Sequence, residues 1–393
     1  MKKAIGIITK NISDILSLDD FLDNAKKYNH KIDYVIITYS NKYDAKFIDN
    51  LRKRVNVVVH KINHFDINYF SKYKIESKNI ANLLFSKEFK EYGLVPYGFN
   101  RNTVLLASIM LGIDYLFFID TDVYPYVLEK QGNENIKGEI DFFGRHIEYL
   151  KEEDIAVTTS DYSGYYIVPP LNVEKMGSFF EGIQKEGMRD YLSNANKHNC
   201  LNFGNSKKQI IRDTGKILGG NLGLKVDVIK RYIPFFSDLL KVGGNVYLTR
   251  GEDTVLGYEL NSAGYRCVDI DTLIFHDTFS TFPNKPNIID DLRVKDRFFY
   301  ATMGWIGRNP MLNWLQNKNL HQVYRRQKKA LEKSVVQVSR YLDDSRFLLL
   351  VDAIDRAYAQ LPQVIRNYEN TVNAWKYFND EWKKGWYDEN IIG

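Results

Sequence analysis

Short apolar runs alternate with amphipathic segments along the first third of this chain. Residues 4–9, 34–39 and 55–62 are rich in β-branched side chains, which suits buried strands, and residues 16–28 and 42–54 between them have helical spacing. Strands joined by helices lie parallel, and their sheet is covered on both faces. Because such crossovers are right-handed, the alternation predicts a doubly wound α/β unit with a mainly parallel central sheet.

The pattern continues with a polar helix over 78–92, a helix over 100–112 and a fourth strand over 115–119. Residues 129–153 and 160–205 are rich in Gly, Asn, Tyr and Ser, and we expect them to form irregular loops around a cleft. These loops would belong to the α/β domain and would not form a domain of their own.

Beyond about residue 290 the chain changes to long amphipathic helices with few glycines, over 322–343 and 347–377. Pro362 would kink or split the second of these helices. We therefore expect an α/β domain over residues 1–285, followed by an α-helical C-terminal extension over residues 286–393.

Composition narrows the class of protein. Apolar residues make up 44% of the 393 residues and charged residues 26%, and no apolar stretch reaches the roughly 20 residues of a membrane span. The two cysteines, Cys200 and Cys267, lack a metal-ligand spacing, which fits a reducing compartment. A net charge of +5 without a basic stripe gives no support to nucleic-acid binding. We expect a soluble, cytoplasmic protein.

Two aspartates follow the predicted strand over 115–119, with Thr121 between them. Ligands of open α/β sheets bind at the carboxyl ends of the strands, and residues i and i+2 of an extended chain point to the same side. Asp120 and Asp122 can therefore converge on one divalent cation, which can bridge a diphosphate. The plainer alternative is that two acids after a strand begin a turn or cap a helix.

Two further segments could contribute residues to the same site as this pair of aspartates. Arg101 and Asn102 open the helix predicted before that strand, where they could bind phosphates or ribose or simply form part of a capping sequence. Gly219 and Gly220 precede Asn221 and an apolar run, and paired glycines permit either the close approach of a ligand or a plain β-turn.

A third segment places Glu252 and Asp253 directly after Gly251, at the start of a helical pattern. Acids in a first helical turn interact favourably with the positive end of the helix, whatever their chemistry. The two carboxylates are therefore either part of a site or simply good N-terminal residues.

Together these segments resemble the family-2-type inverting glycosyltransferases over roughly residues 1–280. The resemblance implies a GT-A fold with a nucleotide-sugar-binding half over 1–125 and an acceptor-binding, catalytic half over 126–285. It also implies a hexosyltransferase that uses Mn²⁺ or Mg²⁺ to move a sugar from a UDP- or GDP-sugar to a hydroxyl of a carbohydrate or another acceptor.

Carried over residue by residue, the resemblance makes Asp253 the general base for the acceptor hydroxyl, with Glu252 beside it. Asp120, Asp122 and His276 would hold the metal, and an imidazole suits Mn²⁺ better than Mg²⁺. His276 could instead be a packed histidine at a strand end. The donor-binding residues would be Thr9, Arg101, Asn102, Asp120, Thr121, Asp122, Gly219, Gly220 and Asn221.

Several alternatives stay open. Residues 9–14 match the family pattern only loosely, which leaves the nucleobase undetermined, and the Tyr-rich insertion before residue 217 could shape an acceptor pocket or be irregular surface. A sugar nucleotidyltransferase fits poorly, because no glycine-rich phosphate loop follows the first strand. A retaining GT-A enzyme resembling mannosylglycerate synthase would not need Asp253 as a base. A catalytically inactive nucleotide- or glycan-binding protein on the same scaffold is the third alternative.

Aromatic and basic residues mix in the C-terminal helices, for example at Arg297, Phe298, Phe299 and Trp305. Such mixtures suit peripheral contact with the inner face of a membrane or a homo-oligomer interface. They also occur in ordinary helix packing, which we favour here.

Overall fold

The computed structural model describes residues 1–62, 96–169, 173–184, 201–206, 211–232, 234–270 and 272–385, together with residues 92, 94 and 171. The polar helix predicted over 78–92 lies outside this part of the chain, except for its last residue. Among the described residues, no helix combines the length and the apolarity needed to cross a membrane.

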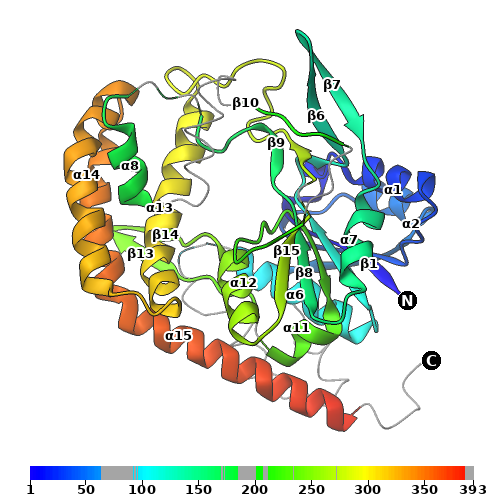
Figure 1. Cartoon of the computed structure of the whole chain (residues 1–393). Coiled ribbons are helices and arrows are strands. Elements are labelled where there is room, and N and C mark those ends of the chain that lie inside the picture. Colours follow the sequence, from blue (N-terminus) through cyan, green and yellow to red (C-terminus); the bar gives the residue numbers. More distant parts are fainter. Residues whose placement is uncertain are drawn as a thin grey trace.

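In the described part of the chain, an eight-stranded sheet forms the centre of the α/β domain (Figure 1). Its strand order is β11-β15-β8-β12-β4-β1-β2-β3. Strands β1 to β4 pair in parallel, as do β8 and β15, whereas β12 and β11 run antiparallel to their neighbours. The strands are β1 (Lys3–Asn11), β2 (Tyr34–Lys42), β3 (Asn56–Lys61), β4 (Tyr115–Ile119), β8 (Ile155–Thr159), β11 (Arg212–Asp213), β12 (Asn221–Lys225) and β15 (Arg266–Asp269).

Helices cover both faces of this sheet. Alternate residues of the central strands point to opposite sides, and because both sets are apolar, both faces must be buried. Leu116 and Phe118 of β4 belong to the core on one face, and Phe117 and Ile119 to the core on the other. The helices on the first face are α6 (Tyr97–Met110), α11 (Val226–Tyr232) and α12 (Glu252–Ser262), and those on the second are α1 (Leu18–Lys27), α2 (Ala45–Arg52) and α7 (Phe142–Leu150). The doubly wound, mainly parallel arrangement is confirmed.

The segments expected to be irregular are more ordered than their composition indicates. Residues 129–153 contain most of the β6–β7 hairpin (Tyr126–Gln131 and Glu134–Glu139) and α7, and residues 160–205 contain β9 (Tyr162–Tyr165), α8 (Met176–Ile183) and β10 (Leu201–Asn202). The loop prediction was therefore wrong for these elements. For β9 and β10 the error has a physical cause, since pairing between residues distant in the chain stabilises short strands that have no local periodicity.

A second, smaller sheet lies beside the first and has the order β10-β9-β16-β5. Strand β5 (Val123–Tyr124) directly follows Asp122, and β16 (Ile274–His276) ends in His276. A separate hairpin is formed by β13 (Leu239–Val242) and β14 (Asn245–Leu248), and β14 leads towards α12. This small sheet therefore brings residues near 122 and 276 together.

The C-terminal extension consists of α13 (Leu292–Leu315), α14 (Leu320–Leu342) and α15 (Leu350–Gly385), as Figure 1 shows. Phe298, Phe299 and Trp305 are buried in a core that these helices share with α8 and the smaller sheet, so the packing interpretation fits these aromatic residues. Pro362 lies inside α15 without splitting it. Buried Leu361 and Val364 hold this part of the helix by tertiary contacts. The predicted fold class, a GT-A-type α/β domain with helical extension, matches this architecture.

Candidate active site

A cavity of about 750 Å³ lies at the carboxyl edge of the central sheet, a size that suits a small-molecule ligand. The ends of β1 and β4 reach it, as does the turn that leads into β12. Most of the residues predicted from the sequence line this cavity, namely Thr9, Arg101, Asp120, Thr121, Asp122, Gly219, Gly220, Glu252, Asp253 and His276.

Asn102 and Asn221, which the sequence assigns to donor binding, do not line this cavity. Both are fully buried. The Asn102 amide donates to the Phe235 carbonyl at 2.8 Å and its oxygen accepts from the Phe235 N–H at 2.7 Å. The Asn221 amide donates to the carbonyl of Ser160 at 2.8 Å. These two side chains satisfy buried backbone groups and so hold loops in place.

Asp120 directly follows the last residue of β4, and its carboxylate lies against the Gly219-Gly220 turn. The Asp120 N–H donates to the Gly220 carbonyl at 3.1 Å, and a Cβ on Gly220 would lie 2.1 Å from an Asp120 carboxylate oxygen. The carboxylate is also 3.5 Å from Nη2 of Arg101. The backbone angle of Gly220 does not demand glycine, but the close approach of Asp120 leaves no room for a Cβ there unless the Asp120 side chain moves.

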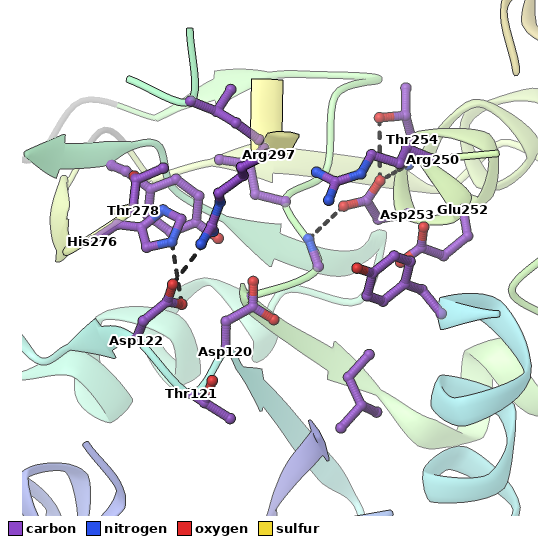
Figure 2. Close-up of a pocket in the computed structure, with 18 of the residues that line it drawn as sticks. Asp120, Thr121, Asp122, Arg250, Glu252, Asp253, Thr254, His276, Thr278 and Arg297 are labelled. Atoms are coloured by element: carbon purple, nitrogen blue, oxygen red, sulfur yellow. Dashed lines mark hydrogen bonds and ion pairs between the residues drawn. The ribbon is translucent and has the colours of Figure 1, made fainter. Parts of the chain in front are cut away.

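Asp122 meets His276 because β5 and β16 pair directly beside them. His276 is opposite Val123 in this ladder, and the Asp277 N–H donates to the Asp122 carbonyl at 3.0 Å. His276 Nε2 lies 3.2 Å from Asp122 Oδ1, and Arg297 Nη2 lies 3.4 Å from Oδ2 (Figure 2). Burial would raise the pKa of Asp122, but His276 and Arg297 outweigh burial and lower it to about 2. Asp122 is therefore ionised at neutral pH.

The predicted metal ligands are only partly assembled. Within the described ranges, no group of three His, Cys, Asp or Glu side chains is placed to hold a metal ion. The Asp122 carboxylate and His276 Nε2 do converge, and Nε2 is buried without a well-oriented hydrogen-bond partner. Asp120 does not complete the trio and instead contacts Arg101. One carboxylate and one imidazole fit Mn²⁺ or Mg²⁺ when phosphate oxygens supply further ligands.

Arg101 and Glu252 form a buried ion pair behind the acidic strand end. The exposed fractions of their side chains are 4% and 6%, and Arg101 Nε donates to Glu252 Oε1 at 3.0 Å. Arg101 Nη1 also donates to the Gly219 carbonyl at 2.6 Å. Burial and the neighbouring Asp253 carboxylate raise the pKa of Glu252, while Arg101 opposes the rise. Glu252 is thus paired with Arg101 in the wall of the cavity, and the neighbouring Asp253 is more exposed to it.

Asp253 lies in the first turn of α12, as the sequence predicts. Gly251 precedes this helix with a φ of 88°, which favours glycine. Asp253 Oδ2 accepts from the Gly219 N–H at 2.6 Å, and Oδ1 accepts from the Thr254 N–H at 2.7 Å. Oδ1 also accepts from the Thr254 hydroxyl at 3.4 Å, so Oδ2 is the oxygen that keeps a further lone pair for a ligand.

Cationic and aromatic residues that the sequence did not predict as site residues also line the cavity. Arg250 precedes Gly251, and Arg297, Trp305 and Arg308 lie on α13 of the C-terminal extension. Arg250 could have been found from the sequence, since it adjoins the predicted acidic pair. The α13 residues recur at helical spacing, but only the packing of the extension shows that this face of α13 lines the cavity.

Comparisons with known proteins give weak likenesses. No family model matches the chain, and no curated protein sequence matches it. A glucosyl-3-phosphoglycerate synthase from Mycobacterium tuberculosis, in complex with Mg²⁺ and uridine diphosphate, is similar in structure at 11% identity and a TM-score of 0.41, covering 81% of this chain and 80% of that chain. TarS (1–349) from S. aureus is similar at 12% identity and a TM-score of 0.38, covering 98% and 92%. Likenesses at this level do not assign a function.

Proposed function

We propose that this protein is a metal-dependent glycosyltransferase that moves a sugar from a nucleotide-diphosphate sugar to an acceptor hydroxyl. One observation carries the proposal. A single cavity at the carboxyl edge of the sheet gathers Asp120, Asp122, His276 and Asp253 from three segments far apart in the chain. This is the edge at which open α/β sheets bind nucleotides.

The donor diphosphate would lie beside Asp122 and His276. These two side chains would hold Mn²⁺ or Mg²⁺, with Asp120 pointing into the same cavity (Figure 2). The bound cation would supply positive charge that stabilises the departing diphosphate. Thr9 lies at the end of β1, on the nucleotide-binding half that we assign to residues 1–125.

Asp253 would act as the general base. Its carboxylate is held by the Gly219 and Thr254 N–H groups and is partly exposed to the cavity. It would take the proton of the acceptor hydroxyl, whose oxygen then attacks the anomeric carbon while the bond to the donor phosphate oxygen breaks. Attack from the face opposite the leaving group inverts the anomeric configuration.

A retaining transferase is the second candidate, and the bonding of Asp253 favours it. Both of its oxygens accept backbone N–H groups, which is also the behaviour of a carboxylate that only holds a loop in place. In that case a donor phosphate oxygen would take the hydroxyl proton. The anomeric configuration of the product, measured by NMR, separates the two reactions.

The first experiment titrates UDP and GDP into the full chain by calorimetry, with and without Mn²⁺. We expect one nucleotide to bind with Mn²⁺ and Asp122→Asn to weaken that binding about tenfold or more. Asp154→Asn serves as the control, because Asp154 is exposed and pairs with Arg266 outside the cavity. Failure of both nucleotides to bind would contradict the proposal.

The second experiment measures turnover of UDP- and GDP-sugars, including their hydrolysis in the absence of an acceptor. Asp253→Asn should keep nucleotide binding and lower transfer by about 100-fold or more. Normal transfer by this variant would favour the retaining reaction. Nucleotide binding without any turnover by the wild-type protein would favour the inactive binding scaffold.

A further inference from the structure

One cation of the cavity, Arg250, has no acidic partner among the residues that the structure describes. Arg250 is half-buried, and no carboxylate among the described residues forms an ion pair with it. Its guanidinium lies over the ring of Tyr97, 5.7 Å from the ring centroid. Two other arginines of the cavity differ, since Arg101 is bound to Glu252 and Arg297 contacts Asp122. Arg250 thus offers donors that no carboxylate in the described part of the chain uses.

The side chain of Arg250 is held in place by the C-terminal extension. Its backbone N–H donates to the Gly304 carbonyl at 3.1 Å. A Cβ on Gly304 would lie 2.7 Å from Arg250 Cγ and 3.0 Å from the Leu248 carbonyl oxygen. Glycine inside a helix is less favourable than alanine by about 1 kcal/mol. The middle of α13 therefore carries a glycine where the Arg250 stem packs against it, and a stem held in this way loses less entropy when it binds an anion.

The position of Arg250 relates it to the acceptor. In Figure 2, Asp120 lies between Asp122 with His276 on one side and Asp253 with Arg250 on the other. Arg250 and Asp253 flank the start of α12 and both line the cavity. A ligand group bound to Arg250 would therefore lie beside the carboxylate that we assign as the base, away from the proposed metal ligands.

We propose that Arg250 binds an anionic group of the acceptor, a phosphate or a carboxylate, and so directs a neighbouring hydroxyl to Asp253. This inference rests on the proposed function and adds the chemical class of the acceptor. Guanidinium groups bind both anions through paired N–H donors. The bound anion would neutralise Arg250, which no carboxylate of the described residues does.

The test titrates small ligands into the full chain that is saturated with the nucleotide it binds and Mn²⁺. Glycerol 3-phosphate, glycolate and glycerol represent a phosphate, a carboxylate and a neutral polyol. We expect at least one of the two acids to bind and glycerol not to bind. Arg250→Gln should weaken binding of the acid about tenfold or more while nucleotide affinity stays within about twofold. Arg293→Gln, on an exposed residue of α13, is the matched control.

A second variant guards against a folding defect in the first. Gly304→Ala leaves Arg250 in the chain but forces its stem to move, so it should also weaken binding of the acid. Thermal unfolding of each variant shows whether the fold is intact. Equal acid binding by wild-type protein, Arg250→Gln and Gly304→Ala would overturn the inference.

The remaining outcomes separate this inference from the proposed function. If the nucleotide binds but neither acid does, the inference fails and the transferase proposal stands. If Arg250→Gln loses nucleotide affinity and keeps acid affinity, Arg250 binds the donor diphosphate, which also overturns the inference. If no nucleotide binds, the proposed function fails. The acids are then titrated into nucleotide-free protein, where binding that depends on Arg250 supports the anion site and binding that does not overturns it.

Discussion

Replacing Gly219 with alanine should mainly lower stability, whereas replacing the adjacent Gly220 should mainly lower turnover. Neither has a positive φ, so alanine is compatible with both backbones. A Cβ on Gly219 would lie 2.5 Å from Nη2 of Arg101, and a Cβ on Gly220 would lie 2.1 Å from the Asp120 carboxylate. The outcome depends on whether each neighbour can move away.

Arg101 cannot move away without breaking buried bonds. Ordinary contact begins at 3.4 Å, so its guanidinium must move by about 0.9 Å, the difference between 3.4 and 2.5 Å. This movement breaks its 2.6 Å bond to the Gly219 carbonyl and disturbs its 3.0 Å bond to Glu252. Removing a partner of a buried ion pair costs about 3–5 kcal/mol, and partial loss roughly 2–3 kcal/mol. Alanine returns about 0.5 kcal/mol through the unfolded state. We expect Gly219→Ala to lower the free energy of unfolding by about 2 kcal/mol.

Asp120 can move, because 36% of its side chain is exposed to the cavity. Its carboxylate can rotate to another rotamer at a cost of about 1 kcal/mol, but Asp120 Cβ would still lie 2.8 Å from the new Cβ, so the backbone must also shift slightly. No buried ion pair is broken by this movement, and we expect Gly220→Ala to lower the free energy of unfolding by less than Gly219→Ala does. The rotation moves the Asp120 carboxylate, a proposed donor-binding group, by more than the roughly 1 Å of misplacement that a catalytic site tolerates. We therefore expect turnover of the sugar donor to fall about 100-fold.

Urea unfolding followed by circular dichroism measures the first effect, and calorimetric nucleotide binding with donor turnover measures the second. Gly177→Ala is the control, since a Cβ there would meet no atom within 4 Å. If Gly219→Ala unfolds at the same urea concentration as the wild-type protein, or if Gly220→Ala is the less stable variant, the reasoning is refuted.

Two other perturbations test the electrostatics. Arg297→Gln should raise Mn²⁺ affinity about fivefold, because the positive charge of Arg297, 3.4 Å from Asp122, repels a cation bound there. Solvent screening of this partly exposed arginine reduces the repulsion to about 1 kcal/mol. Calorimetry with Arg293→Gln as the control checks this, and unchanged affinity would count against the metal site. Burial lowers the pKa of His146 from 6.5 to about 3, so stability is complete above pH 6.5 and is lost as the pH falls towards 3. Between pH 7 and pH 5 the wild-type protein should lose about 2 kcal/mol more than His146→Phe in urea unfolding, and parallel losses would contradict a neutral buried histidine.

The amino-acid sequence by itself determined the doubly wound sheet and the edge at which the site lies. The side chains on both faces of a strand such as residues 34–39 are apolar and must be buried. The intervening helices bury them by covering both sides of a parallel sheet. The location of Asp120, Asp122 and Asp253 at the cavity was predictable because strand ends and helix starts have local signatures. The same local signals could not show that the Asn102 and Asn221 side chains point into the core.

Only the tertiary structure decided which of these groups act on one another. The β5–β16 pairing places His276 on Asp122, and pairing between distant strands depends on contacts that no local pattern encodes. Tertiary packing also pairs Glu252 with Arg101 and places Arg297 of the C-terminal extension at the cavity. Periodicity in a helix shows which residues share a face, but the packing of the helix determines what that face meets.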